Sequence, residues 1–278
     1  MKVVIVGCGV VGKAHYERIR NKYNVTCVDK GEWSDGDVYI IAIAPGIRFE
    51  EYDEIMRKIN GEIVVVSTMS YEVFKALESR YSFSVFPERL TPPSQESKVR
   101  LLGLDKNARY TKEIASLWNY IEVPKDVAVL AKIFENAIWA LNIAIVEEIT
   151  RKFGKEVIKA IKTHERLEWL PVPQIGIGGL CLPKDSKMAA ELLDIFFYVE
   201  SYDTKFRSHK LEKLIEKVQK AGGKFRWVGG FGYKPNVSIT ANSPAFEYYK
   251  ALKERFLESE DGITVSAYGG GEINIIDL

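Results

Sequence analysis

Residues 2–12 read KVVIVGCGVVG, a β-branched run that ends on three glycines. A helical pattern with alternating charges follows, so the predicted order is strand, glycine turn, helix. In such a turn the first glycine permits a tight bend, the second lets a pyrophosphate approach the backbone, and the third lets helix and strand pack closely. The residues predicted to bind a dinucleotide here are Gly7, Gly9, Val10, Val11 and Gly12.

An acidic residue follows the next predicted strand, residues 25–28. Asp29 stands seventeen residues after the last glycine of the turn, where a carboxylate accepts hydrogen bonds from an adenosine ribose. This favours NAD over NADP, and Lys30 beside it makes the preference modest. A lone GxGxxG is a weak signal whose ordinary alternative is a glycine-rich turn. The flanking strands and helix favour the NAD interpretation.

Strands and helices continue to alternate through the first half of the chain, which predicts an α/β fold with a Rossmann-like, doubly wound parallel sheet. Expected strands cover 38–44, 62–66 and 82–86, and expected helices cover 49–59 and 71–77. We expect three parts: an NAD-binding domain at 1–124, a central helical domain at 125–221 and a reduced α/β unit at 222–278. In the later parts the expected helices are 188–197, 208–221 and 245–257, and the expected strands are 225–228 and 263–267.

The composition is that of a soluble globular protein. The 278 residues are 46% hydrophobic and 28% charged, with a net charge of +1, which provides no general attraction to nucleic acid or to a membrane surface. We predict no secretory signal, no membrane span and no metal site. Three cysteines are too few for a disulfide framework, so Cys8 and Cys27 are expected to be buried small residues in a reducing cytoplasm.

Two segments follow strand ends, at the edge where open α/β sheets bind ligands. The first is Ser67-Thr68, whose hydroxyls could face a substrate; the alternative is a cap for the helix at 71–77. The second is Pro87-Glu88-Arg89-Leu90, where Glu88 could equally be a surface ion-pair partner.

The longest helical pattern runs from 125 to 153 and has a wide apolar face. Such a face implies burial on more than one side, and we expect it to join two domains or two subunits of a homodimer. Lys132 and Asn136 are one turn apart within it. Lysine in such a place is often an edge residue that extends to solvent, but next to an amide it could also bind developing negative charge.

The segment 175–185, IGIGGLCLPKD, is the most informative. Pro183 suits the first turn of a helix, which places Cys181 at the helix N-terminus. Free N–H groups and the helix dipole favour a reactive thiolate there, so Cys181 is a candidate nucleophile.

The glycine turn, the Lys-Asn pair and GGLCLPKD together resemble the nucleotide-sugar 6-dehydrogenase family, of which UDP-glucose dehydrogenase is a well-known kind. The likeness extends to FGYKPN at 231–236 and NSP at 242–244. It implies a four-electron oxidation of a UDP-sugar C6 alcohol to a uronate with NAD, in polysaccharide biosynthesis.

The resemblance also implies roles. Cys181 would form a thiohemiacetal and then a thioester, and Lys132 and Asn136 would bind the oxyanions. Asp185 and Thr68 would hold the water or proton path, and Glu88 would be the base for thioester hydrolysis. The residues expected to bind substrate are Arg166, Arg89, Leu90 and Gly178, and Lys234 is expected to bind a phosphate.

The chain also departs from the family pattern. Only eight residues separate Asp29 from the strand at 38, and Ala241 stands where the family has an arginine. CLPKD favours UDP-glucose slightly, whereas PER resembles the N-acetylhexosamine branch. Two alternatives stay open: a two-electron β-hydroxyacid-type dehydrogenase, and a non-catalytic protein that binds NAD or a nucleotide-sugar.

Overall fold

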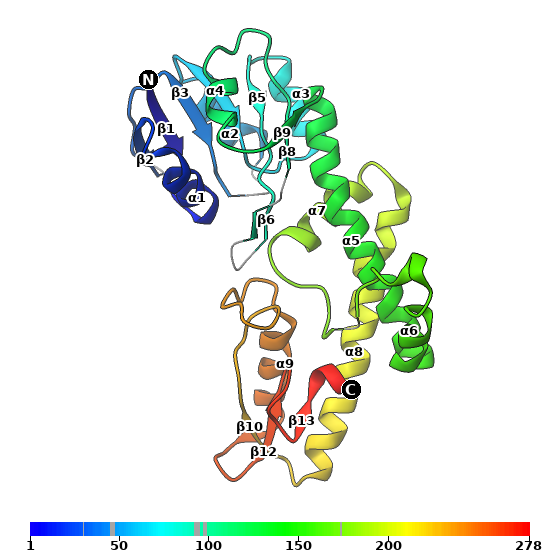
Figure 1. The fold of residues 1–278 in the computed structure, drawn as a ribbon. Helices are drawn as coiled ribbons and strands as arrows, with labels where there is room; N and C mark the ends of the chain where they lie inside the picture. The colour runs from blue at the N-terminus through cyan, green and yellow to red at the C-terminus, as the bar shows by residue number, and fades with distance from the viewer. Residues whose placement is uncertain (30, 45–47, 92–94, 97–98, 173) are drawn as a thin grey trace. The chain divides into compact units, whose positions relative to one another are not determined.

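The structure is a computed structural model that describes the chain except residues 30, 45–47, 92–94, 97–98 and 173; of residues 90, 91, 95 and 96 it describes the backbone (Figure 1). The chain forms two compact units, Met1–Ile133 and Phe134–Leu278, and each is described by itself. The boundary falls inside the helix α5 (Lys125–Phe153), whose bounds are those that the sequence predicts.

The first unit contains a five-stranded parallel sheet in the order β2-β1-β3-β4-β5. Its strands are β1 (Lys2–Val6), β2 (Asn24–Val28), β3 (Val38–Ile41), β4 (Glu62–Val65) and β5 (Ser84–Val85). Because β1 pairs with both β2 and β3, the strand order reverses beside β1. Open α/β sheets bind ligands at the carboxyl ends of strands beside such a reversal.

Both faces of this sheet are covered. Val3 and Ile5 belong to an apolar cluster that includes Ile19 of α1 (Val10–Ile19). Val4 belongs to a different cluster, against which Ile55 of α2 (Phe49–Met56) packs. Successive residues of a strand point to opposite faces, so the sheet has helices on both sides and the predicted α/β class is confirmed.

Shorter elements complete the first unit. The helix α3 (Tyr71–Glu78) follows β4, and α4 (Thr111–Ala115) follows later in the chain, after β5. The strands β6 (Leu90–Thr91) and β7 (Gln95–Glu96) form an antiparallel pair, and β8 (Arg100–Leu102) pairs in parallel with β9 (Tyr120–Glu122).

The two cysteines of the first unit form a disulfide. Cys8 follows β1, Cys27 lies in β2, and both are only partly buried. The expectation of two buried, reduced cysteines is therefore wrong. Neighbouring parallel strands bring the two side chains together although they are 19 residues apart in sequence.

The second unit begins with the last part of α5 and continues with helices. These are α6 (Lys155–Ile161), the short η1 (Glu165–Leu167), α7 (Cys181–Ala190), η2 (Asp194–Phe196) and α8 (Phe197–Lys220). The expected helix at 188–197 is thus wrong, because α7 ends at Ala190 and α8 starts at Phe197. Leu193, which precedes η2, has an extended backbone that interrupts the helical run.

A four-stranded parallel sheet, β11-β10-β12-β13, ends the chain. Its strands are β10 (Lys224–Trp227), β11 (Leu257–Glu258), β12 (Ile263–Ser266) and β13 (Ile273–Asn274), with α9 (Pro244–Lys253) between the first two and η3 (Ile275–Asp277) at the end. Phe225, Tyr248 and Val265 share one apolar core with Leu214 of α8. This reduced α/β unit therefore packs on α8 within the second unit.

By length and composition, α5 could cross a membrane, contrary to the sequence-based expectation of no such run. The core helix of a soluble protein passes the same test. Ala137, Ala140 and Ala144 on α5 are fully buried, as expected of a core helix.

Candidate functional site

The glycine turn after β1 has the geometry that a dinucleotide requires. Gly7 has φ +101°, and a Cβ there would lie 2.5 Å from the carbonyl oxygen of Ala42. A Cβ on Gly12 would lie 1.8 Å from the oxygen of Gly7, so this glycine permits close packing of α1 on the turn. Open space surrounds the corresponding position of Gly9. Gly7 thus permits the tight bend, Gly12 permits the close packing, and Gly9 leaves open space for a ligand. These are the three requirements of a dinucleotide-binding glycine turn.

Val10 and Val11 begin α1, and Val10 is 65% exposed. No side chain caps this end of the helix, since Gly9 stands at the cap position. First-turn N–H groups and the helix dipole attract a phosphate. This turn therefore fits the pyrophosphate of NAD.

Asp29 directly follows β2 and is exposed. One of its carboxylate oxygens accepts a hydrogen bond from the Cys8 N–H at 2.8 Å. The disulfide between Cys8 and Cys27 joins the same two segments. Asp29 thus stands at the place expected of a ribose-binding acid, and it also holds the glycine turn. Lys30 lies outside the described residues.

Ser67 and Thr68 follow β4, but neither caps α3. The capping residue is Ser70, whose hydroxyl accepts from the N–H of Val73 at 3.3 Å. The Ser67 hydroxyl donates to the carbonyl of Ile43 at 2.8 Å. The capping alternative is therefore wrong, and the half-buried Thr68 is the hydroxyl of this pair that lies nearer to solvent.

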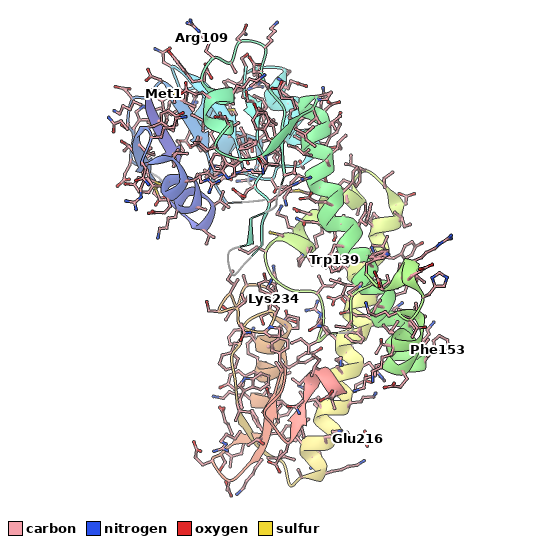
Figure 2. All side chains as sticks on the ribbon, in the orientation of Figure 1. Met1, Arg109, Trp139, Phe153, Glu216 and Lys234 are labelled. Carbon is pink, nitrogen blue, oxygen red and sulfur yellow. A yellow bond between two sulfur atoms is a disulfide. The ribbon has the colours of Figure 1, made fainter. Side chains whose placement is uncertain are left out.

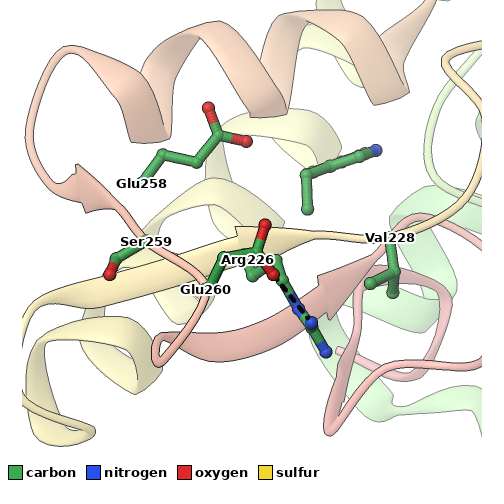
Figure 3. A pocket seen from close by; sticks show the side chains of 6 residues that line it. Arg226, Val228, Glu258, Ser259 and Glu260 are labelled. Carbon is green, nitrogen blue, oxygen red and sulfur yellow. Dashed lines mark hydrogen bonds and ion pairs between the residues drawn. The ribbon is translucent and has the colours of Figure 1, made fainter.

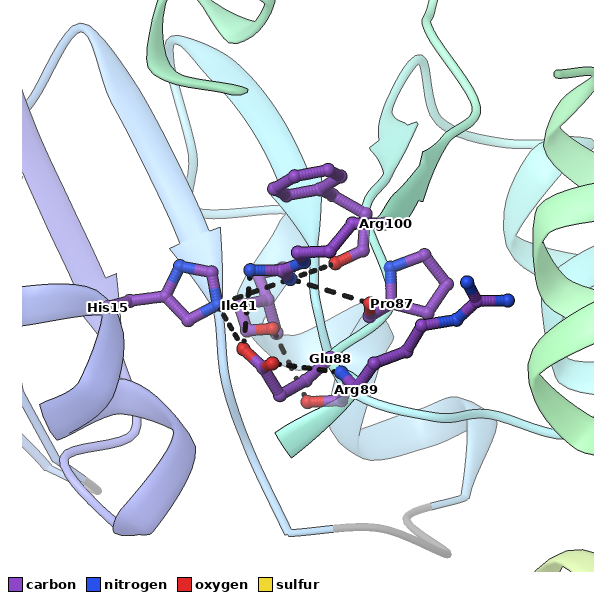
Figure 4. Close-up of polar contacts among 8 residues, drawn as sticks. His15, Ile41, Pro87, Glu88, Arg89 and Arg100 are labelled. Carbon is purple, nitrogen blue, oxygen red and sulfur yellow. Dashed lines mark hydrogen bonds and ion pairs between the residues drawn. The ribbon is translucent and has the colours of Figure 1, made fainter. Parts of the chain in front are cut away.

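Glu88 lies beyond β5 within a cluster of charges. His15 of α1 and Arg100 of β8 point toward its carboxylate (Figure 4). The Nε2 atom of His15 is 2.8 Å from Oε2 of Glu88, and Nη1 of Arg100 is 3.4 Å from the same oxygen. The Glu88 side chain is only 12% exposed, so this is a largely buried ion pair rather than a surface one.

Burial alone would raise the pKa of Glu88, but the hydrogen bond with His15 and the charge of Arg100 outweigh it and lower the pKa to about 2. The Arg100 guanidinium also lies 3.8 Å above the ring of Phe86 and donates to the carbonyl of Phe86 at 2.8 Å. Glu88 is therefore held as an anion, and an anion of such low pKa is a weak base.

Arg89 and Leu90 follow Glu88 directly in the chain. The Arg89 guanidinium donates to the carbonyl of Val99 at 3.0 Å, and its N–H donates to Glu88 at 2.8 Å. Leu90 begins β6, and its side chain lies outside the described part of the structure. A substrate-binding role stays a prediction for both residues.

In the second unit, Cys181 is the first residue of α7, as predicted, and it is exposed. Asp185 is one turn later on the same helix and is fully buried. Its carboxylate accepts a hydrogen bond from the Asn136 amide of α5 at 2.5 Å and another from the Lys184 ammonium. The helices α5 and α7 thus bring together three residues that the sequence predicts to act jointly: the thiol, the carboxylate and the amide.

Lys132 precedes Asn136 by one turn of α5 and is only 8% exposed. A solvent-directed edge lysine would be far more exposed. Burial of the lysine therefore favours the interpretation that it serves a negatively charged group.

The loop before Cys181 is shaped by residues of the C-terminal region. A Cβ on Gly178 would lie 2.8 Å from atoms of Tyr233, Asn242 and Pro244. Gly179 has φ +83°, and a Cβ there would lie 3.0 Å from the Tyr233 ring. The Asn242 amide donates to the carbonyl of Gly179 at 3.0 Å. Only glycine fits at these two positions, since any larger residue would displace the loop that leads to Cys181.

Two further residues, Arg166 and Lys234, are predicted to bind anionic parts of the ligands. Arg166 is exposed in η1, where its carbonyl accepts a hydrogen bond from the Trp169 indole at 2.7 Å. Lys234 is half-buried, and its ammonium lies 5.7 Å from the centre of the Tyr233 ring. Anion binding by either residue stays a prediction.

A cavity of about 590 Å³ opens beside β10 and β11 (Figure 3). Its lining includes the ion pair between Arg226 and Glu260, with N···O 3.1 Å. The Glu260 side chain is 92% exposed, and no predicted site residue lines this cavity. It is therefore separate from the candidate site.

Sequence reasoning missed several residues that shape the site. Tyr233 and Asn242 belong to the FGYKPN and NSP segments, so the motif was visible but the role of each side chain was not. His15 lies in a helix with mixed charges, where nothing in the local pattern distinguishes it from a surface residue.

Comparison with known proteins agrees with these motifs. Residues 126–195 match the model for the central domain of the UDP-glucose/GDP-mannose dehydrogenase family. A curated UDP-N-acetyl-D-mannosamine dehydrogenase from Pyrococcus horikoshii is 29% identical over 145 residues. This match covers 47% of the present chain and 34% of the relative, about a third of its length.

Solved structures show the same fold. The structure of a UDP-D-ManNAc dehydrogenase from Pyrococcus horikoshii superposes with a TM-score of 0.77 at 18% identity, covering 98% of this chain and 84% of that one. A UDP-glucose dehydrogenase from Pyrobaculum islandicum gives 0.71 at 16% identity, covering 95% and 81%. A UDP-N-acetyl-mannosamine dehydrogenase from Staphylococcus aureus gives 0.73 at 18% identity, covering 99% and 84%.

The resemblance expected from the glycine turn and the GGLCLPKD segment is thereby confirmed. Within residues 126–195, the chain is similar to the central domain of the UDP-glucose/GDP-mannose dehydrogenase family.

Proposed function

We propose that the protein is an NAD-dependent UDP-sugar 6-dehydrogenase that oxidises a C6 alcohol to a uronate, a four-electron oxidation in two hydride-transfer steps. The observation that carries this proposal is the arrangement around α7: an exposed Cys181 thiol at the helix N-terminus, with Asp185 one turn later and bonded to Asn136. A two-electron alcohol dehydrogenase has no need of such a nucleophile.

The cofactor would be held by the first unit. Gly7, Gly9 and Gly12 provide the turn for the pyrophosphate, and Asp29 provides the acid for the ribose. Bound NAD supplies the acceptor for one hydride at each of two oxidation stages. A reaction that removes two hydrides from one carbon is possible only if that carbon gains a new bond between them.

Cys181 makes that bond. Its thiolate adds to the aldehyde carbon, and a C–S bond forms as the carbonyl electron pair moves to oxygen. Loss of the second hydride converts the thiohemiacetal into a thioester. Water then adds to the thioester carbon, the C–S bond breaks, and the carboxylate leaves as the thiol is restored.

The oxygen of each tetrahedral species carries negative charge, which Lys132 and Asn136 would stabilise. Asp185 orients Asn136 through the hydrogen bond between them. Asp185 and Thr68 would hold the water or proton path of the alcohol step. Arg166, Arg89, Leu90 and Gly178 are the proposed substrate contacts, and Lys234 the proposed phosphate contact.

Glu88 is the proposed base for thioester hydrolysis, but its pairing with His15 and Arg100 weakens that role. A base with so low a pKa accepts a proton from water poorly. Release of Glu88 from this pair would be required before it could act.

The sugar is the least constrained part of the proposal. CLPKD resembles the glucose branch, whereas the curated relative oxidises UDP-N-acetyl-D-mannosamine by name. We propose a homodimer as the working unit and the cytoplasm as its compartment.

The deciding experiment is the NADH yield from limiting UDP-glucose, UDP-N-acetylglucosamine or UDP-N-acetylmannosamine with excess NAD. We expect two NADH per sugar with at least one of them. One NADH would indicate a two-electron dehydrogenase, and binding without NADH would indicate a non-catalytic binding protein. Cys181→Ser should lose multiple turnover, and full turnover by this variant would exclude the thioester route.

A further inference from the structure

The loop that leads to Cys181 is anchored by buried polar side chains of α8 and α9. Asp203 of α8 is 4% exposed and accepts a hydrogen bond from the backbone N–H of Ile177 at 2.6 Å. Tyr248 of α9 is 3% exposed, and its hydroxyl donates to the carbonyl of Ile175 at 2.8 Å. The carbonyl of Ile175 and the N–H of Ile177 are thus both bound by side chains of α8 and α9.

Arg207 fixes the carboxylate of Asp203. Its guanidinium lies 2.6 Å from Oδ2 of Asp203, and it also bonds to Glu247 of α9 at 2.6 Å. A Cβ on Gly176, which has φ +123°, would lie 2.6 Å from the Arg207 side chain and 3.1 Å from Oδ1 of Asp203. The loop therefore rests directly on this ion pair, and charge-assisted hydrogen bonds of this kind are stronger than neutral ones.

Apolar packing holds Ile175, which lies in an apolar core, whereas Ile177 borders a cavity. This cavity of about 360 Å³ lies on one side of the loop, lined by Ile177 together with Ser186 of α7, Phe196 of η2 and residues of α8. A side chain that faces a cavity lacks neighbours to resist its movement. The bond from Asp203 therefore restrains the backbone at Ile177, and the bond from Tyr248 restrains it at Ile175.

Asp203 carries the negative charge, because a second buried carboxyl group, that of Glu147, is the one that holds a proton. Glu147 of α5 is fully buried, and neither of its carboxyl oxygens has a hydrogen-bond partner among the described residues. Burial first, and then the charge of Asp203, raise the pKa of Glu147 well above its ordinary value, although Arg207 and Lys210 act in the opposite direction. Because Asp203 has both the ion pair and the N–H donor, the proton belongs on Glu147.

We propose that Asp203, together with Tyr248, positions the glycine loop at 175–180 and thereby sets the location of the Cys181 thiol for the reaction. Neither side chain touches substrate in this proposal. It rests on the function proposed above, and it explains why a carboxylate is buried against this loop.

The first test compares Asp203→Asn and Asp203→Ala with the protein itself. The asparagine variant keeps an acceptor for the Ile177 N–H but loses the charge that binds Arg207. We expect kcat to fall by about 10-fold for asparagine and about 100-fold for alanine, because small displacements of reacting groups have effects of that size. The KM for the sugar should change by less than about 3-fold, since binding is not the step affected.

The second test reads the position of Cys181 without any enzyme activity. Cys8 and Cys27 are joined to each other, so iodoacetamide reports on Cys181. Alkylation should slow by about 3- to 10-fold in Asp203→Asn, because a displaced thiol loses the N–H environment that favours the thiolate. Hydrogen exchange of the peptide 175–180 should rise in parallel.

Glu216→Gln is the matched control. It is also a carboxylate-to-amide change on α8, but its partner is Lys220 and its side chain is 62% exposed. It should leave kcat and alkylation unchanged. If the Asp203 variants do not fold, Tyr248→Phe removes only the hydroxyl and should reproduce the faster exchange and slower alkylation.

Folded Asp203 variants with unchanged alkylation and exchange would overturn the proposal, as would a Tyr248→Phe variant without effect where the others fail to fold. A protein that forms no NADH but shows the alkylation and exchange changes would contradict the proposed function and leave the positioning role established. The two failures are therefore distinguishable.

Discussion

At the scale of single residues, the chemistry depends on how each charge is compensated. Asp185 is fully buried and bonded to Asn136 and Lys184, whereas Glu88 is bonded to His15 and Arg100. A buried carboxylate is stable only with such partners, because transfer of an unpaired charge from water is very costly. Both acids are therefore fixed in place by neighbours that are themselves buried or half-buried.

Glu88 gives a prediction about stability and pH. Its pKa in the folded protein is about 2 against an ordinary 4.5, so its contribution is complete above pH about 4.5 and is lost as the pH falls toward 2. A shift of this size corresponds to on the order of 3 kcal/mol. Glu88→Gln should lower the free energy of unfolding by about 2–3 kcal/mol at pH 7 and flatten its dependence on pH between about 4.5 and 2.

Denaturant unfolding at several pH values measures this effect. Glu17→Gln is the control, because Glu17 forms an exposed pair with Arg20 on α1 and should cost less than about 1 kcal/mol. Equal stabilities of the two variants at pH 7 would show that the cluster around Glu88 does not hold the fold.

At the scale of elements, the sequence predicts what depends on local pattern. The bounds of α5, the strands β1 and β2 and the start of α7 at Cys181 follow from periodicity, β-branched runs and a proline in the first turn. The break between α7 and α8 was not predicted, because the apolar pattern continues through Leu193 although the backbone does not remain helical there.

The disulfide and the site around Asp203 could not be predicted for a different reason. Each depends on which segments become neighbours in space: β1 with β2 for the cysteines, and the 175–180 loop with α8 for Asp203. Spacing in the sequence contains no information about that adjacency. In the candidate site, motif residues such as Cys181 could be found, whereas residues that hold the motif in place, such as Tyr248, could not.

The disulfide between Cys8 and Cys27 should stabilise the element that carries the glycine turn. It closes a loop with a sequence separation of 19 residues, and loops of about this length restrict the unfolded chain by about 3 kcal/mol. Cys8→Ser combined with Cys27→Ser should therefore lose about 2–3 kcal/mol of unfolding free energy.

Unfolding with and without dithiothreitol provides the measurement. Reductant should destabilise the protein to about the level of the double variant and should not affect that variant further. Cys181→Ser, which leaves the disulfide in place, is the control and should keep the full response to reductant. An unfolding midpoint that is the same with and without dithiothreitol would contradict the prediction.

At the scale of the whole molecule, α5 has more apolar surface than one chain covers. Ile138, Trp139 and Ile145 are 52%, 42% and 45% exposed, and Trp139 can be located on α5 in Figure 2. Ile138 and Ile145 are seven residues apart, which places them two turns apart on one side of the helix. Exposed apolar residues that recur on one helix face are typical of a subunit interface.

The exposed apolar residues of α5 allow the predicted homodimer to be tested. Ile138→Glu combined with Ile145→Glu would place two charges in the apolar interface of a symmetric dimer, where each change occurs twice. We expect the protein to elute as a dimer from a sizing column with light scattering and the double variant to elute as a monomer. Leu257→Glu is the control. Leu257 is 62% exposed and belongs to β11 rather than to α5. This variant should remain a dimer. Equal masses for the protein and the double variant would mean that α5 does not form the interface, and the exposed stripe would then require another occupant.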